Sequence, residues 1–197
     1  MPPKELSPSR ELLLAQVREI YGRIVYTHKA HEKQADIYDK KDRRQRTFRV
    51  VLTAVSSGAF LASILGIVLN QQWGAIVTSF IAVLLSATTL AEKSFKHGEE
   101  MQLHRGTAAE MWDLRESYLS LIVDVKSGIE TDAACQDRRD ALQARAVSTL
   151  REAPRTTSKA YTSAQIALQS NDELTFTPGE IDHLLPLRLR DSGEATE

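Results

Sequence analysis

Hydrophobic positions recur along the first forty residues with the period of an amphipathic helix. Eight residues separated by three or four positions form this stripe: Leu13, Val17, Ile20, Ile24, His28, His31, Ala35 and Tyr38. Such spacing places them on one helical face. Ser7 followed by Pro8 suits an N-cap and a first helical turn. Because no Gly or Pro follows Gly22 in this stretch, we expect one helix of roughly 60 residues that continues into the next segment.

The next segment contains no charged side chain over 42 residues, from Val50 to Ala91. A polar, turn-prone break, Asn70 to Gly74, divides it into parts of 20 residues (50–69) and 18 residues (74–91). At about 1.5 Å per residue, a helix of about 20 residues crosses a hydrocarbon core about 30 Å thick. The pattern predicts a tight transmembrane hairpin. Two core helices of a soluble protein are the alternative, but such helices usually keep a polar edge, and neither half shows a charged one.

A second amphipathic stripe follows the hairpin. Its positions are Met101, His104, Ala108, Met111, Arg115, Tyr118, Ile122 and Val125. Ser127-Gly128 is a suitable helix end, since Gly tolerates the left-handed conformation. Two striped helices that leave the same membrane face should pack together as an antiparallel stalk. Shorter helices are expected at 131–151 and 157–169, with a final turn or two from Thr177.

These patterns predict an all-α membrane protein with four regions. An N-terminal cytoplasmic helix (1–49) precedes the hairpin (50–91), which is followed by a C-terminal cytoplasmic helical region (92–187). The remaining residues, 188–197, are expected to form a disordered tail because they are mostly charged or polar and contain few apolar residues.

Basic residues flank the predicted hairpin on one side. We call them the basic cuff: Lys40, Lys41, Arg43, Arg44, Arg46, Arg49, Lys93 and Lys96. Positive charge beside a span stays in the cytoplasm, and the connecting loop has no Lys or Arg. We therefore expect a multi-pass membrane protein with both termini cytoplasmic.

Charge is distributed unevenly along the chain. Residues 1–49 hold 12 Lys/Arg and 7 Asp/Glu, a net +5, whereas residues 92–197 hold 13 and 19, a net −6. Basic clusters beside a span attract anionic lipid. Direct nucleic-acid binding is not expected, because no aromatic residues for base stacking are interspersed in the basic run. The single cysteine, Cys135, permits no intramolecular disulfide.

Small residues form two ridges in the hairpin, one on each predicted span. They recur every four residues: Ala54, Gly58, Ala62 and Gly66 on the first, and Thr78, Ala82 and Ser86 on the second. Small side chains let membrane helices approach closely, either within the hairpin or between subunits. Four further hydroxyl positions are candidates to line a pore: Thr53, Ser56, Ser57 and Ser63. Hydroxyls also bond readily within their own helix, which is the alternative.

Residues that suggest catalysis are scarce. His28 and His31, with Glu32 and Asp36 nearby, have a spacing that can hold a metal, but packing between helices explains them better. The chain has no Gly-rich phosphate loop, Gly-x-Ser-x-Gly motif or paired-cysteine motif. We therefore expect no enzyme activity, no metal and no cofactor.

Several segments together resemble the SLATT family over about residues 15–187. They are Tyr26-Thr27-His28 in the long helix, the charge-free hairpin, His104-Arg105, the run from Trp112 to Ile122 followed by Asp124, and the ending from Leu174 to Pro186. The run Arg115-Glu116-Ser117-Tyr118-Leu119 is the most specific of these segments.

This resemblance implies a two-span, oligomeric, pore-forming or membrane-perturbing effector of an antiviral conflict system. Such effectors are paired with a nucleotide-producing or nucleotide-sensing partner, or with a reverse transcriptase, and no catalytic residues are attributed to the family. We expect the trigger to be a partner protein or a nucleotide signal. Two alternatives stay open: a passive membrane-anchored helical scaffold for a soluble partner, and a soluble helical binding module.

Overall fold

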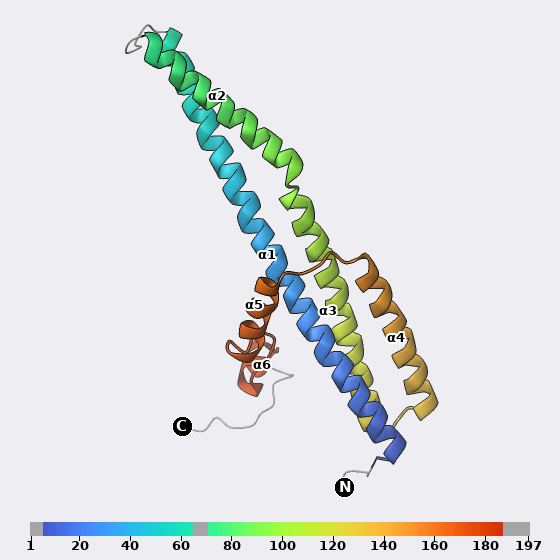
Figure 1. Ribbon diagram of the computed structural model, residues 1–197. Coiled ribbons are helices and arrows are strands. Elements are labelled where there is room, and N and C mark those ends of the chain that lie inside the picture. The colour runs from blue at the N-terminus through green and yellow to red at the C-terminus, as the bar shows by residue number, and fades with distance from the viewer. Residues whose placement is uncertain (1–5, 65–70, 187–197) are drawn as a thin grey trace, which may run out of the picture.

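A computed structural model describes residues 6–64 and 71–186 of the chain, and all regular structure in these residues is helical (Figure 1). The first helix, α1 (Pro8–Ile64), has 57 residues, which confirms the expected long helix. Ser7 Oγ accepts a hydrogen bond from the backbone N–H of Arg10 at 3.3 Å, as an N-cap does. Residues 65–69 of the predicted first span, and residue 70 in the predicted break, lie outside the described residues.

The chain returns along α1 in two successive helices. Figure 1 shows α2 (Gln71–Ser94) beside the upper half of α1 and α3 (His97–Ser127) beside the lower half. The two residues between them, Phe95 and Lys96, break the helix at a place where the sequence pattern indicated no break. At the other end of α3, Gly128 adopts a φ of 68°, and its N–H bonds the carbonyl of Asp124. The predicted left-handed helix stop is confirmed.

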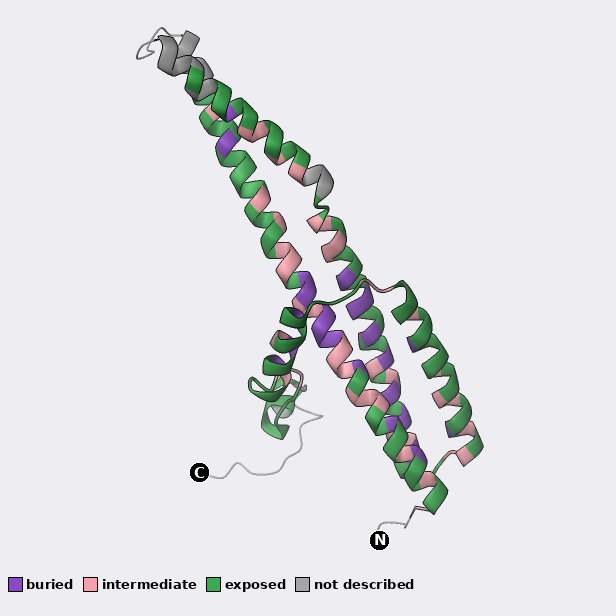
Figure 2. Ribbon diagram, viewed as in Figure 1, coloured by how far each residue is buried: buried purple, intermediate pink, exposed green. Residues whose placement is uncertain are grey.

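The predicted stalk is confirmed as the antiparallel pairing of α1 with α3. Val17 and Ile24 of the first stripe are buried, as are Met111, Tyr118 and Val125 of the second. Purple residues in Figure 2 follow the facing sides of these two helices. Leu114 and Leu121, which are not among the eight stripe positions, are fully buried as well, whereas Trp112 and Leu119 are exposed.

Two further helices pack on opposite sides of the stalk. Helix α4 (Asp132–Glu152) folds back against α3 and adds Cys135 and Ala146 to the core. Helix α5 (Ser158–Gln169) lies on α1 (Figure 1), and short α6 (Pro178–Leu184) follows it. Hydroxyls of Thr131 and Thr157 cap α4 and α5, which begin within a residue of the predicted positions. The expected disordered tail, 188–197, lies outside the described residues.

Arg10 fastens the start of α1 to the far end of α3. Its Nε donates to the carbonyl of Val125 at 2.7 Å, and Nη2 donates to the carbonyl of Glu130 at 2.9 Å. Nη1 forms a 2.7 Å ion pair with Asp132, the first residue of α4. The guanidinium therefore donates hydrogen bonds to backbone carbonyls at and just after the C-terminal end of α3 that would otherwise lack partners. It also joins α1, α3 and α4 at one point.

Candidate functional site

The two arms of the hairpin touch through large side chains. Leu52 of α1 and Ile81 of α2 are buried, at 9% and 8% exposure. Ser56, Leu84 and Leu85 are half-buried near them in the sequence. Large aliphatic side chains between two helices keep the backbones apart, as in ordinary ridge-and-groove packing. The contact within one chain is therefore not the close approach that small residues permit.

The small-residue ridges lie away from this contact where the structure describes them. Ala54 and Gly58 on α1 are exposed, as are Ala82 and Ser86 on α2. A Cβ added at Gly58 would meet nothing within 4 Å. These four residues do not contribute to closure of the hairpin in the single chain, and the role of the ridges stays a prediction. The other predicted positions lie outside the part of the structure described at side-chain level: Ala62, Gly66 and Thr78.

Two of the hydroxyls suggested as pore-lining bond within their own helix. Thr53 Oγ1 donates to the carbonyl of Arg49 at 2.8 Å, and Ser57 Oγ donates to the carbonyl of Thr53 at 2.9 Å. Ser56 is half-buried, and the side chain of Ser63 lies outside the described part. A hydroxyl that bonds its own backbone can be exposed to lipid at little cost, so these residues do not require a wet surface.

Apolar side chains on the outer faces of both arms are uncovered. Seven are more than half exposed: Val50, Val51, Val55, Ile76, Phe80, Val83 and Leu90. Figure 2 shows this part of the molecule as mostly green, in contrast to the stalk. A soluble monomer seldom exposes so extended an apolar surface.

Membrane spans were expected at 50–69 and 74–91. Within residues 6–64 and 71–186, no helix combines the length and the apolar composition that crossing a membrane requires. The expected spans stay a prediction, and part of the first one falls on residues that the structure does not describe.

The basic cuff is only partly free to attract lipid. Arg43 and Arg46 form ion pairs one turn back along α1, with Asp39 at 2.9 Å and Asp42 at 2.8 Å. Lys96 bonds Glu99, which raises the pKa of the lysine. Lys40, Lys41 and Arg44 are exposed; Arg49 is exposed too but has an interaction partner, and the side chain of Lys93 lies outside the described part. Internal pairing therefore reduces the net positive charge that this surface presents.

Histidines from α1 and α3 meet at the centre of the stalk. His31 Nδ1 and His104 Nδ1 are 2.9 Å apart, and both rings are buried. His28 Nδ1 lies 3.0 Å from the carbonyl of Ala108, to which it donates. Burial lowers the pKa of His31 to about 4, helped by the nearby rings of His104 and His28. Burial also lowers the pKa of His104, against the opposing effect of Glu100.

The metal alternative for His28 and His31 does not fit this geometry. Each histidine uses Nδ1 for a bond across the helix interface, and His28 Nε2 is 3.6 Å from Glu32 Oε2. Among the described residues, no three His, Cys, Asp or Glu side chains are grouped as metal ligands would be. These histidines join the two helices of the stalk, as the packing interpretation held.

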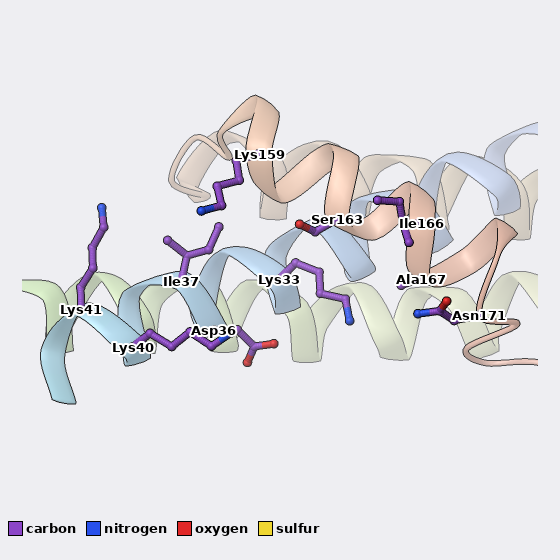
Figure 3. Close-up of a pocket in the computed structure, with 10 residues that line it drawn as sticks. All are labelled: Lys33, Asp36, Ile37, Lys40, Lys41, Lys159, Ser163, Ile166, Ala167 and Asn171. Atoms are coloured by element: carbon purple, nitrogen blue, oxygen red, sulfur yellow. The ribbon is translucent and has the colours of Figure 1, made fainter. Parts of the chain in front are cut away.

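A cleft between α1 and α5 is a site that the sequence patterns did not indicate. We call it the lysine cleft; it has a volume of about 490 Å³ (Figure 3). Its lining comes from α1 and from α5 with the residues after it: Lys33, Asp36, Ile37, Lys40, Lys41, Lys159, Ser163, Ile166, Ala167 and Asn171. Figure 3 shows Lys159 of α5 reaching across toward Ile37 of α1.

Polar contacts and small residues hold α5 against α1 beside the cleft. Gln34 Oε1 accepts hydrogen bonds from the backbone N–H of Thr157 at 3.0 Å and from its hydroxyl at 2.7 Å. Glu173 forms ion pairs with Lys29 at 2.7 Å and Lys33 at 3.1 Å, and these bonds lower the pKa of Glu173. Three buried alanines of α5 permit close packing: Ala160, Ala164 and Ala167. The lysine cleft is therefore part of a firmly packed interface.

Comparison with known proteins identifies the family of this chain. No curated protein and no solved structure matches the chain. A family model described as "SMODS and SLOG-associating 2TM effector domain family 4" matches residues 13–180, which include the stalk, the hairpin, α4, α5 and the start of α6. This chain therefore belongs to the SMODS and SLOG-associating two-transmembrane effector domain family, the SLATT family.

Proposed function

We propose that the protein is an oligomeric, membrane-perturbing or pore-forming effector of a bacterial antiviral conflict system. Residues 50–91 form its two membrane spans, and both termini lie on the cytoplasmic side of the inner membrane. A partner protein or a nucleotide signal triggers it. It acts by assembly and not by catalysis.

The observation that carries this proposal is the uncovered apolar surface of the hairpin. Phe80, Val83 and Leu90 of α2 are each more than 60% exposed, although the stalk of the same chain buries its apolar stripe completely at Val17 and Met111. Removing apolar surface from water stabilises by about 25 cal/mol per Å². Lipid supplies that stabilisation for the outer face, in agreement with a stretch of 42 residues without charge.

Oligomerisation follows from the small-residue ridges. Ala54 and Gly58 are exposed in the single chain, and the same holds for Ala82 and Ser86. Within lipid, association depends on close backbone contact and not on hydrophobic burial. A second copy of the hairpin offers the surface that these small side chains fit.

Voltage-sensitive dye in bacteria that express the protein with its genomic partners tests the function. Viral infection or supply of the partner's signal should depolarise cells that carry the protein and leave control cells polarised. Purified protein should also make liposomes conductive after activation. A small fixed dimer that never permeabilises liposomes would instead support the membrane-anchored scaffold.

A further inference from the structure

Positive charge in the lysine cleft is only partly compensated within the chain: Lys33 pairs with Glu173, and Asp36 is the one carboxylate in the described lining. Further along α1, Arg43 and Arg46 each have an ion-pair partner one turn away. Lys40 and Lys159, on opposite walls of the cleft, form no ion pair within residues 6–64 and 71–186. The ammonium of Lys41 lies 5.4 Å from the centre of the Tyr38 ring. Like charges around a shared cavity repel each other, which favours an anion between them.

The floor of the cleft is apolar, and its size suits a small molecule. Ile37 of α1 lies next to Lys159, and Ile166 and Ala167 of α5 lie toward the other end of the cleft, near Asn171 (Figure 3). Ser163 and Asn171 add groups that form hydrogen bonds. The volume of about 490 Å³ falls within the range typical of small-molecule sites. An anion with an apolar or planar body fits this lining better than a bare inorganic ion does.

We infer that the lysine cleft binds a soluble, multiply phosphorylated small molecule of nucleotide size. Lysine ammonium groups bind phosphate as mobile point charges, and Lys40 on α1 and Lys159 on α5 supply one such group from each wall; Lys40, which extends toward Asp36, would turn toward the ligand (Figure 3). The body of the ligand lies on Ile37 and Ile166. Asp36, at the edge of the cleft, is a carboxylate positioned to accept a hydrogen bond from a ligand hydroxyl or amino group.

A lipid headgroup is the other source of phosphate, and the tests below distinguish the two sources. Lys40 precedes Val50 by ten residues, which is about 15 Å along a helix. Headgroups extend about 5–7 Å beyond the hydrocarbon core, so Lys40 lies about one Debye length, about 8 Å, beyond the headgroup layer. This step rests on the proposed membrane placement, whereas the binding of a phosphorylated solute does not.

The cleft is suited to convey a signal because its walls belong to different helices. A ligand that contacts Lys40 and Lys159 stabilises the docking of α5 on α1. Helix α1 continues from Lys40 to Ile64 without a break, so its lower half and the first arm of the hairpin are one element. Binding at the cleft therefore favours those arrangements of the assembly in which α5 is docked.

Fluorescence anisotropy on the full chain in detergent tests the site, with a labelled nucleoside triphosphate as the probe. We expect saturable binding that weakens as salt is raised. The double variant Lys40→Gln/Lys159→Gln should raise Kd by about tenfold or more, since each lost charge-assisted bond to phosphate is worth about that factor. Lys126→Gln is the matched control: it removes one exposed lysine at the far end of α3 and should leave Kd unchanged.

The outcomes separate this inference from the proposed function. The lysine cleft is not a binding site if the triphosphate does not bind saturably, or if Lys126→Gln raises Kd as much as the double variant does. Either result would contradict the inference even if the protein depolarises cells. Flotation with phosphatidylcholine vesicles, with and without phosphatidylserine, is the second arm. If the double variant loses only phosphatidylserine-dependent flotation and no triphosphate binds, the soluble ligand is wrong. Circular dichroism of both variants checks that α5 and the stalk stay folded.

Discussion

A hydrogen bond between two histidine rings joins the helices of the stalk at its centre. His31 of α1 and His104 of α3 share one proton between their Nδ1 atoms at 2.9 Å, so one ring donates and the other accepts. His28, Tyr38 and Glu100 are the other polar or titratable groups around the pair. Two protonated rings have no acceptor for this bond and repel each other. The pair is therefore stable only while at least one ring is neutral.

Acid should destabilise the stalk through His31. The pKa of His31 is about 4 in the folded chain and about 6.5 when unfolded, so the unfolded state binds more protons between these values. The stabilisation is fully present above pH 6.5 and is lost as pH falls toward 4. From pH 7 to pH 5, His31 alone should lower the free energy of unfolding by about 2 kcal/mol. Urea unfolding followed by circular dichroism measures this change.

Substitution of the histidine identifies the source of that pH dependence. His31→Gln should lower stability at pH 7 but flatten its dependence on pH between 7 and 5. Gln102→Ala, at an exposed and non-titrating position of α3, is the control and should leave the slope unchanged. An unchanged slope in His31→Gln would show that another group titrates.

Arg10 should contribute strongly to stability because it joins α1, α3 and α4. Arg10→Ala removes the bonds to the carbonyls of Val125 and Glu130 and the ion pair with Asp132. We expect a loss of about 2–3 kcal/mol, typical of charge-assisted hydrogen bonds that are partly buried. Arg18→Ala removes an exposed arginine of the same helix and should cost less than about 0.5 kcal/mol. Equal losses in the two variants would contradict the role assigned to Arg10.

Periodicity identified many of these residues without revealing their partners. The spacing of His28 and His31 placed both on the packing face of α1, and the structure confirms this. The bonding partner of each histidine depends on the register of α1 against α3. His31 bonds a residue 73 positions away in the sequence, and His28 bonds one 80 positions away. A heptad-like stripe repeats along its length and so does not determine that register. Arg10 gave no periodic signal, because its role depends on where α3 ends.

At the scale of the elements, the hairpin and the stalk pack differently. Leu52 and Ile81 hold the arms of the hairpin together, whereas the stalk buries a continuous stripe. The small residues Ala54 and Gly58 remain on an open face of α1. The sequence pattern places the small residues in ridges, but it does not distinguish a contact within the chain from one between chains. That distinction depends on how α2 is rotated against α1.

The exposed small-residue ridge of α1 predicts that a bulky side chain placed there weakens the association of hairpins. Gly58→Leu should weaken association of the hairpins and reduce depolarisation about tenfold or more, because it separates backbones that small residues allow to touch. Val55→Leu enlarges an exposed apolar residue of the same helix and should have little effect. Cross-linking in membranes measures association, and the dye measures depolarisation. Full activity of Gly58→Leu and Ala54→Leu would contradict the role of the ridge.

The lysine cleft shows what periodicity cannot find. Lys40 precedes the hairpin and Lys159 lies on a short helix 119 positions later, so no local spacing connects them. Only the docking of α5 on α1, through Gln34 and Thr157, brings the two walls together. The turn signals that delimit α4 and α5, by contrast, are local hydroxyl caps, and the sequence placed both helices within a residue or two.

At the scale of the whole molecule, the packed stalk continues directly into the hairpin. Helix α1 links them, running from the Arg10 contact at one end to the uncovered apolar surface at the other. The all-helical architecture and the antiparallel stalk followed from hydrophobic periodicity and are confirmed. The break at Phe95 and Lys96 was not predicted. Neither residue is a strong helix breaker, so the geometry at the meeting of α2 and α3 determines it.

The placement of residues 50–91 in a bilayer is the claim on which the proposed function depends. It is tested most directly by labelling single cysteines with a membrane-impermeant maleimide in a Cys135→Ala background. Position 73 lies in the expected outer loop, and position 126 lies at the far end of the stalk. Trp73→Cys should react from outside intact spheroplasts, whereas Lys126→Cys should react only after the membrane is permeabilised. Equal labelling of both positions in intact spheroplasts, or recovery of the chain in the soluble fraction, would contradict the placement.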